Sequence, residues 1–346
     1  MAEMSLSNFL LLGVTTFSIV GLLTPLVRRF ALSHDVFDVP TESHKTHVKP
    51  VPYLGGVAII LGVIFVTYLV SILSSFTADT VFLASTILIP ALIMGIIGLI
   101  DDLRKLKPWP RFLMQSIFGV VISLSLVMTE TLGSPLGNVW IDVPLTSLWI
   151  VGITNAVNFF DNIDGGASGV IFVSASFLFF LSWQSDQVLI AAMSMVLAGA
   201  TLGFLLWNKP PARIYMGDAG ALFLGVLMAS LSTRFNPSPI DRFASYSIPI
   251  LLLAMPIMDT SVAVLSRIHS GVSPFQGGRD HLSHRLMGKG YSKKQAILIL
   301  WAMSVFFCLL ATAISYSNHA FEKLLMIFAF ICWGILSIYF FLLKNR

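Results

Sequence analysis

The chain has 346 residues, of which 56% are hydrophobic and only 11% are charged. A soluble domain carries about 25% charged residues, so this composition excludes a soluble globular protein and indicates an integral membrane protein. The formal charge of +4 does not indicate a nucleic-acid partner, because the basic residues are scattered in short loops and form no stripe.

Eleven apolar runs are candidates for membrane helices, which need roughly 20 mostly apolar residues. The first run is expected to be a membrane span and not a cleavable signal, because no basic segment precedes it. We therefore predict an all-α integral membrane protein with one polytopic domain over residues 1–346. The predicted spans are 5–27, 54–75, 80–100, 112–129, 143–160, 167–185, 187–207, 219–233, 244–266, 295–317 and 324–343.

The basic residues divide unevenly between the two sides of these spans. All but three of the 21 Lys and Arg residues fall on one side, the exceptions being Arg234, Arg242 and Lys323. Cytoplasmic loops carry such an excess, so we predict an outside N-terminus, a cytoplasmic C-terminus and one active face on the cytoplasmic side of a bacterial inner membrane. The predicted cytoplasmic loops are 28–53, 101–111, 161–166, 208–218 and 267–294.

The first of these loops is basic around Lys45 and then rich in Pro and Gly from Pro50 to Gly56. One interpretation is the ordinary positive flank of a membrane helix. The other is a site for an anionic headgroup, in which Lys45 contacts the substrate.

Asp101 and Asp102 follow a run without charged residues at the end of the third span. Such a pair can be a solvated helix end, although acids at a helix C-terminus gain nothing from the dipole. The functional alternative is a pair that handles a hard cation or a phosphate. Magnesium usually takes one or two carboxylates and leaves its other positions to water and phosphate oxygens.

Asn158, Asp161 and Asp164 close the fifth span at steps of three. If the helix persists, they share one face, and Gly165 then interrupts it. A polar turn explains one acid beside the membrane, but it does not explain this density of Asn and Asp. We therefore predict that these residues recognise a nucleotide.

Asp218 lies between Gly217 and the eighth span, after a segment that Pro210 and Pro211 keep from being helical. It could cap the helix that follows. The alternative is a magnesium ligand, favoured by flanking glycines that let a phosphate approach.

The last long loop contains His281 and His284 between Arg279 and Arg285. Two histidines alone do not complete a zinc site, so hydrogen bonding to phosphate is the predicted role of these four residues. Upstream, Asp259 interrupts the ninth span. An intramembrane acid is functional by default, unless a partner such as Arg267 or a neighbouring amide satisfies it.

With these motifs in this order, the chain resembles the polyprenyl-phosphate N-acetylhexosamine-1-phosphate transferases, glycosyltransferase family 4, to which the phospho-N-acetylmuramoyl-pentapeptide transferases are related. The resemblance covers nearly the whole chain. The last loop departs from the family pattern at Ser283, where sugar-1-phosphate transferases often have a histidine. The motifs are Pro-x-Pro-x-x-Gly-Gly at 50–56, the acidic pair 101–102, the stretch 158–165, Met216-Gly217-Asp218, the segment 259–267 and the loop 280–286.

The resemblance implies transfer of a sugar-1-phosphate from a UDP-sugar, with UDP-N-acetylglucosamine as the first expectation, to polyprenyl (undecaprenyl) phosphate. UMP is released, Mg²⁺ or Mn²⁺ is needed, and the product initiates a cell-envelope glycan. A homodimer is compatible with this expectation. The implied catalytic residues are Asp101, Asp102 and Asp218, with Asp102 and Asp218 as metal ligands; the implied nucleotide-pocket residues are Asn158, Asp161 and Asp164; and the implied donor ligands are His281 and His284.

We expect the lipid phosphate to attack directly the phosphorus that bears the sugar, because a phosphate monoester is already largely dianionic near neutral pH. A covalent aspartyl-phosphate route is the alternative. Two other functions stay open: a phospho-N-acetylmuramoyl-pentapeptide transferase and a transporter of an anionic substrate. A transporter usually places its charges near mid-bilayer, whereas here they collect on one face.

Overall fold

Helices form where the sequence is continuously apolar, because inside a bilayer the backbone must satisfy its own hydrogen bonds. The computed structural model describes residues 4–38, 50–73, 77–104, 106, 108–237, 241–274 and 278–343. Two short strands, β1 (Phe37–Asp38) and β2 (Val51–Pro52), pair antiparallel. The helices are α1 (Leu6–Ser33), α2 (Gly55–Leu73), α3 (Ala78–Arg104), α4 (Pro108–Met128), α5 (Val139–Phe160), α6 (Gly166–Gln184), α7 (Val188–Asn208), α8 (Gly217–Arg234), α9 (Arg242–Leu252), α10 (Ala254–His269), α11 (Leu282–Gly288), α12 (Lys293–Tyr316) and α13 (His319–Leu342).

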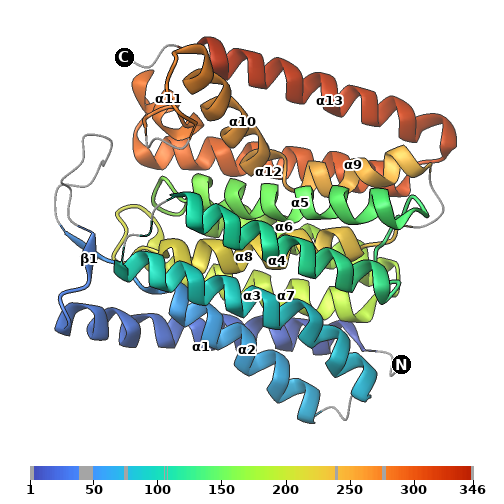
Figure 1. Ribbon diagram of the computed structural model, residues 1–346, viewed down its shortest axis with the longest axis horizontal. Coiled ribbons are helices and arrows are strands. Elements are labelled where there is room, and N and C mark those ends of the chain that lie inside the picture. The colour runs from blue at the N-terminus through green and yellow to red at the C-terminus, as the bar shows by residue number, and fades with distance from the viewer. Residues whose placement is uncertain are drawn as a thin grey trace.

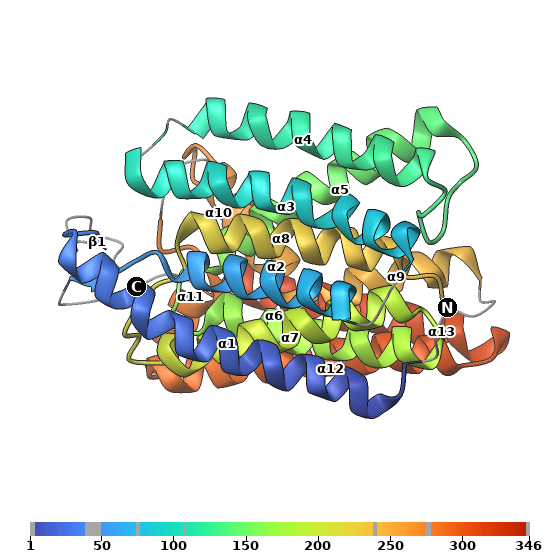
Figure 2. The same cartoon turned by 90° about the horizontal axis from the view of Figure 1, so that it is seen from below.

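The long helices run along one common direction (Figure 1). The connections after α1, α3, α5, α7 and α10 lie at one end of the bundle, on the left of Figure 1, and we call this the site end. The connections after α2, α4, α6, α8 and α12 lie at the opposite end, and the view in Figure 2 gives the same division. Helix α1 therefore begins at the opposite end, and α13 finishes at the site end.

Nine of the described helices are long and apolar enough to cross a membrane, which confirms an all-α integral membrane protein. The predicted ninth span is not one continuous helix. It consists of α9 and α10, which meet at Leu253 with a bend of 76°. Pro249 and Pro256 flank this break, and proline inside a helix removes a backbone hydrogen bond and kinks the chain.

Helix α8 lies within the bundle, packed against α2, α3 and α5. Glycines bring its neighbours unusually close. A Cβ atom at Gly56 would lie 2.2 Å from the backbone nitrogen of Gly220, and one at Gly98 would lie 2.4 Å from the carbonyl oxygen of Asp218. The Gly-Gly pair of the first loop motif therefore has a packing role, because it seats α2 on the first turn of α8.

Gly56→Ala is expected to prevent normal folding, because the added methyl group would meet backbone atoms that cannot rotate away. Gly334→Ala in α13 is the matched control, since a Cβ there meets nothing within 4 Å. In a helix that change should stabilise by about 0.5–1 kcal/mol. The yield of monodisperse protein in detergent and its melting temperature check this prediction, and a G56A protein as stable as the wild type contradicts it.

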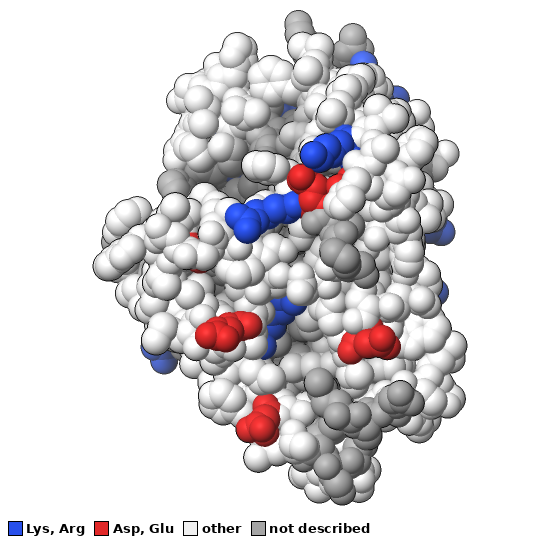
Figure 3. Space-filling model, turned by 90° about the vertical axis from the view of Figure 1, so that its right-hand side faces the viewer, with Lys and Arg blue, Asp and Glu red and all other residues white. Residues whose placement is uncertain are grey.

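The end opposite the site end carries few charges. Figure 3 looks onto it and shows a few acidic and basic side chains on a mostly uncharged surface. The polar contacts there join neighbouring connections, such as the Nε2 group of Gln187 with the carbonyl oxygen of Asn236 and the amide of Gly133 with the carbonyl oxygen of Thr233. The polar groups at this end therefore serve to hold the helix connections together. The clustered acids lie at the site end.

Candidate active site

Arg111 joins two of the predicted catalytic acids. Asp101 lies in the last turn of α3, and Asp218 lies in the first turn of α8. The Nη1 atom of Arg111, on α4, lies 2.5 Å from Asp101 Oδ2 and 2.7 Å from Asp218 Oδ2. The other oxygen of Asp218 accepts a hydrogen bond of 2.7 Å from Asn158 Nδ2, on α5. Four helices thus meet at one polar cluster.

Asp102 caps α8 across space. Its two carboxylate oxygens accept hydrogen bonds from the backbone N–H groups of Asp218 and Ala219, at 2.9 and 3.1 Å. The first N–H groups of a helix lack partners within it and face its positive end, so a carboxylate there is stabilising. Gly217, with φ 74°, leaves room, because a Cβ there would lie 2.6 Å from Asp102 Oδ2. The capping role considered for Asp218 therefore belongs to Asp102.

Asp161 lies directly after α5, beside the other acids. Withdrawal from water, and then the negative charges of Asp218, Asp102 and Asp164, raise the pKa of the Asp161 carboxyl well above its usual value. Among the described residues, no cation or hydrogen-bond donor offsets this effect. An ionised Asp161 is therefore destabilising in the free protein, and a bound cation would relieve the repulsion.

Asp161→Asn is expected to raise the melting temperature of the ligand-free protein. The folded state holds a proton at Asp161 more tightly than the unfolded chain does, so the free energy of unfolding falls as pH rises from the ordinary value of 3.8 toward the raised pKa. The gain from D161N should therefore be larger at about pH 8 than at about pH 5. Thermal melts with a metal chelator check this.

Asp186→Asn, an exposed substitution at the opposite end, is the matched control and should show no such trend. A gain for D161N that shrinks as pH rises would contradict the raised pKa. The activity of D161N should fall, because proteins often keep a destabilising charge at a site where that charge is needed for activity.

The predicted shared face of Asn158, Asp161 and Asp164 requires a helix that continues through Asp164. Helix α5 ends at Phe160, and a turn that finishes at Gly165, with φ 73°, follows it. The expectation is therefore wrong for Asp164.

Asp164 instead fastens the connection between α7 and α8. Its Oδ2 accepts a hydrogen bond of 3.1 Å from the backbone N–H of Ala212 and lies 3.8 Å from Lys293 Nζ. The side chain of Asn208 strengthens the same junction, because its Oδ1 accepts from the N–H of Gly165 at 2.9 Å. These contacts hold the segment that leads to Asp218. The predicted nucleotide contact of Asp164 stays a prediction.

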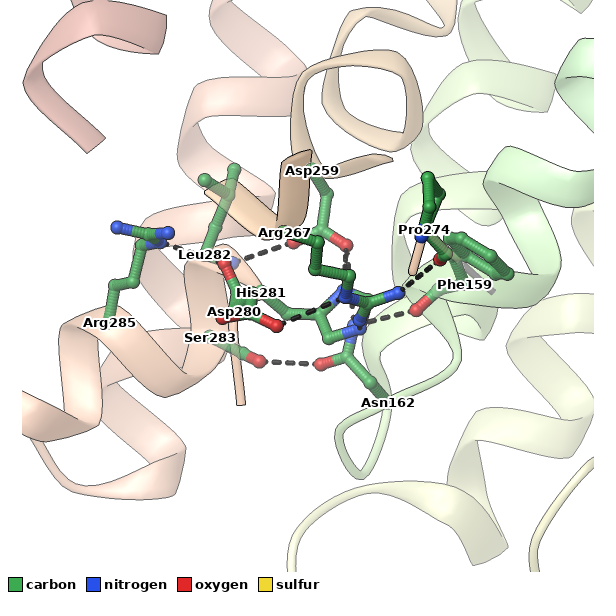
Figure 4. Close-up of polar contacts among 10 residues, drawn as sticks. All are labelled: Phe159, Asn162, Asp259, Arg267, Pro274, Asp280, His281, Leu282, Ser283 and Arg285. Carbon is green, nitrogen blue, oxygen red and sulfur yellow. Dashed lines mark hydrogen bonds and ion pairs between the residues drawn. The ribbon is translucent and has the colours of Figure 1, made fainter. Parts of the chain in front are cut away.

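The histidine loop (residues 278–288) is anchored from inside the bundle, as Figure 4 shows. Asp259 of α10 is fully buried, and its Oδ2 lies 2.7 Å from His281 Nδ1. The hydroxyl of Ser283, the residue at the departure from the family pattern, donates to Asn162 Oδ1 at 2.5 Å. The loop is therefore tied both to α10 and to the turn after α5.

Arg285 lies at the edge of this group in Figure 4, where its Nε donates to the carbonyl oxygen of Asp280 at 2.8 Å. Its Nη1 donates to the carbonyl oxygens of Phe340 and Leu343, at 2.9 and 2.6 Å, and the residue is buried. These are the last carbonyls of α13, and arginine commonly stabilises such a terminus. These contacts give Arg285 a helix-capping role, and its predicted substrate contact stays a prediction.

Three predicted substrate ligands remain. His284 is partly exposed on α11, with its ring 6.2 Å from that of His281, and Arg279 is exposed near the start of the same loop. Lys45 lies outside the described residues.

Sequence reasoning missed Arg111 as a site residue, although it contacts two of the predicted acids. In the sequence it counts only as one of several bases after Asp102, and only the fold selects it. Asn162 was missed for the same reason. Arg267, considered above as a partner of Asp259, instead contacts Asp280, the carbonyl oxygen of Pro274 and His281. A usable signal existed, because buried acids need cationic or amide partners on the same side of the membrane.

The acids fit a divalent cation of the magnesium type. Among the described residues, no three His, Cys, Asp or Glu side chains form a closed metal site. Magnesium does not need one, because it is usually held by one or two carboxylates together with water and substrate phosphates. Asp161, without an offsetting partner, and Asp218 supply such carboxylates. Asp102 retains unused lone pairs, so its predicted metal contact stays a prediction.

The comparisons with known proteins agree with this arrangement. Residues 84–236 match the model of glycosyl transferase family 4. The chain is 34% identical over 299 residues to a probable undecaprenyl-phosphate N-acetylglucosaminyl 1-phosphate transferase of Bacillus subtilis, covering 84% of this chain and 81% of the relative.

Two further relatives have different names within the same family. A decaprenyl-phosphate N-acetylglucosaminephosphotransferase of Mycobacterium tuberculosis is 33% identical, over 87% of this chain and 81% of its own. A phospho-N-acetylmuramoyl-pentapeptide-transferase of Streptococcus mutans is 29% identical, over 90% of this chain and 99% of its own. With such identity across most of both chains, the protein belongs to glycosyl transferase family 4.

Proposed function

We propose that this protein transfers N-acetylglucosamine-1-phosphate from UDP-N-acetylglucosamine to a polyprenyl phosphate and releases UMP. The observation that carries the proposal is the meeting of Asp101, Asp218, Arg111 and Asn158 at the ends of four helices. The relatives at 34% and 33% identity carry names with the same sugar, whereas the pentapeptide-transferase relative is at 29%. The pentapeptide donor is therefore the second candidate.

The chemical difficulty of this reaction is charge, since an anionic lipid phosphate must approach a pyrophosphate. Positioning and neutralisation provide most of the catalysis in phosphoryl transfer. Arg111 supplies a cation inside the acid cluster, which we define as Asp101, Asp102, Asp161 and Asp218. Asn158 supplies an amide beside Asp218 that orients its carboxylate. The lipid phosphate needs little help from a base, so direct attack on the sugar-bearing phosphorus is the proposed route.

Magnesium or manganese, held by Asp218 and Asp161 with Asp102 close by, would neutralise the phosphate oxygens and so reduce the repulsion between the reactants. Asp161 would then be ionised, because a nearby cation favours the charged carboxylate.

The lipid substrate also needs an apolar surface. A cavity of about 580 Å³ lies between α5, α8, α9 and α10. Its lining is mostly apolar and extends along α5 as far as Ala156, two residues before Asn158. This supports entry of a long hydrocarbon chain from the membrane toward the acid cluster.

We further propose eleven crossings, with the α9–α10 pair and the enclosed α8 counted as one crossing each. The alternation of connections between the two ends supports this count. The distribution of Lys and Arg supports a cytoplasmic site end, an outside N-terminus and a bacterial inner membrane. One-sided labelling of single cysteines introduced at Asp79 and Lys289 tests the orientation.

The function is tested with purified protein, radiolabelled UDP-N-acetylglucosamine, polyprenyl phosphate and Mg²⁺. Label in the lipid phase with equal release of UMP supports the proposal. Activity only with the UDP-N-acetylmuramoyl-pentapeptide donor supports the second candidate. Accumulation of label inside vesicles without transfer to lipid would indicate a transporter and overturn both.

A further inference from the structure

Asp259 is a fully buried carboxylate that makes its contacts outside its own helix. Its Oδ2 lies 2.7 Å from His281 Nδ1, and its Oδ1 accepts from the backbone N–H of Leu282 at 2.7 Å. Asn162 Nδ2 lies 3.4 Å from Oδ2 (Figure 4). Removing a carboxylate from water costs several kcal/mol unless such hydrogen bonds satisfy it. The acid and the histidine loop therefore depend on each other.

The contacts of His281 define its tautomer. Arg267 Nη2 lies 3.3 Å from His281 Nε2. A guanidinium only donates hydrogen bonds, so Nε2 must accept, and the ring proton lies on Nδ1 and points at Asp259. Arg267 is itself fixed, because its Nε lies 3.0 Å from Asp280 and its Nη1 donates to the carbonyl oxygen of Pro274.

Both ring nitrogens of His281 are thus engaged inside the protein, and the residue is only 7% exposed. This geometry differs from the sequence-based expectation that His281 binds the donor phosphate. His284, one turn further along α11, is the partly exposed histidine.

We propose that Asp259 is a positioning residue of the transferase, acting through His281 to hold the histidine loop so that His284 faces the donor. The proposal rests on the proposed function for its kinetic consequences. The Ser283–Asn162 hydrogen bond supports it from the other side, because Asn162 also donates to the carbonyl oxygen of Phe159, at the end of α5. The loop is therefore set relative to the same helix that carries Asn158.

The deciding comparison is His281→Asn against His281→Ala. An asparagine side chain places an N–H donor where Nδ1 stands, so it preserves the link to Asp259, but it has no atom in the place of Nε2. Positioning through Nδ1 predicts that H281N keeps kcat/KM within about threefold of the wild type and that H281A loses at least about tenfold. Equal losses in the two variants would mean that the contacts of Nε2, and not the link from Nδ1 to Asp259, carry the effect of His281, and would overturn the proposal.

The pH profile gives a second readout. H281N should retain both limbs of the wild-type kcat profile, because a positioning ring exchanges no proton with the reactants. Loss of one limb would overturn the proposal. His269→Asn and His269→Ala are the matched controls, since His269 is an exposed histidine at the end of α10.

Asp259→Asn tests the other partner. Either orientation of the amide turns its NH₂ group toward a donor, the N–H of Leu282 or the Nδ1–H of His281. The loss of kcat/KM in D259N should match that in H281A. The double variant that carries both D259N and H281A should lose no more kcat/KM than either single variant, within about twofold. Multiplied losses would overturn the proposal. The melting temperature of each variant shows whether a loss of activity comes from unfolding. If D259N does not fold, the comparison of H281N with H281A tests the proposal alone.

The tautomer is tested without activity by ¹⁵N-histidine NMR of the purified protein, with H281N used to assign the signal. Protonated Nδ1 and unprotonated Nε2 support the proposal, and the reverse overturns it. A wild-type protein that shows this tautomer but transfers no sugar-phosphate would refute the proposed function and leave the contact itself established.

Discussion

Asp218→Asn is expected to lower kcat on the order of 10²–10³-fold or more, the range found when one preorganised group that handles transition-state charge is removed. The carboxylate lies between the cation of Arg111 and the amide of Asn158. An asparagine can still accept from Asn158, but it then turns its own NH₂ group toward Arg111. Both the negative charge and the orientation are lost. The KM for the UDP-sugar should change less than kcat.

Folding should survive this substitution, because the first turn of α8 is capped by Asp102 and not by Asp218. Initial rates at saturating lipid, with melting temperatures alongside, check the prediction. Asp79→Asn is the matched control, the same chemical change at the exposed opposite end of α3. A D218N enzyme that keeps activity within about tenfold of the wild type would contradict the assigned role.

The sequence predicted which acids form the site, but it did not predict that they have different partners and roles. Asp101 and Asp102 appear equivalent as neighbours in a motif. Consecutive helical residues point in directions about 100° apart at 3.6 residues per turn, so the two carboxylates meet different partners. Asp101 receives Arg111, and Asp102 receives the N-terminus of α8. No local pattern specifies this, because both partners come from other helices.

The same limit applies to the fold. Apolar length predicted where helices lie, since a membrane span is defined mainly by hydrophobicity. It did not predict the bend at Leu253, because mean hydropathy contains no information on direction. Pro249 and Pro256 were the available signal. The role of Asp259 could be predicted only in part. The free-energy cost of a carboxylate inside the membrane predicted that Asp259 has a partner, but the partner, His281, follows 22 residues later in a separate loop.

Arg111→Met is expected to impair both stability and activity, because it leaves Asp101 and Asp218 facing each other without their shared cation. The cost should lie between the ~1 kcal/mol of an exposed ion pair and the ~3–5 kcal/mol of removing one partner from a buried pair, since Arg111 is 23% and Asp218 29% exposed. Arg111→Lys should recover only part of this, because a single ammonium lacks the rigid fork of the guanidinium. Melting temperatures and initial rates measure the two effects.

The double variant Asp101→Asn with Arg111→Met separates repulsion from simple loss of packing. If like charges cause the instability, removing one of them should restore part of the melting temperature that R111M lost, a coupling that a double-mutant cycle measures directly. Activity should not return, because Asp218 still lacks its cation. Arg242→Lys, an exposed change at the opposite end, controls for detergent and expression effects. Additive losses in the double variant would show that Arg111 does not couple the two acids.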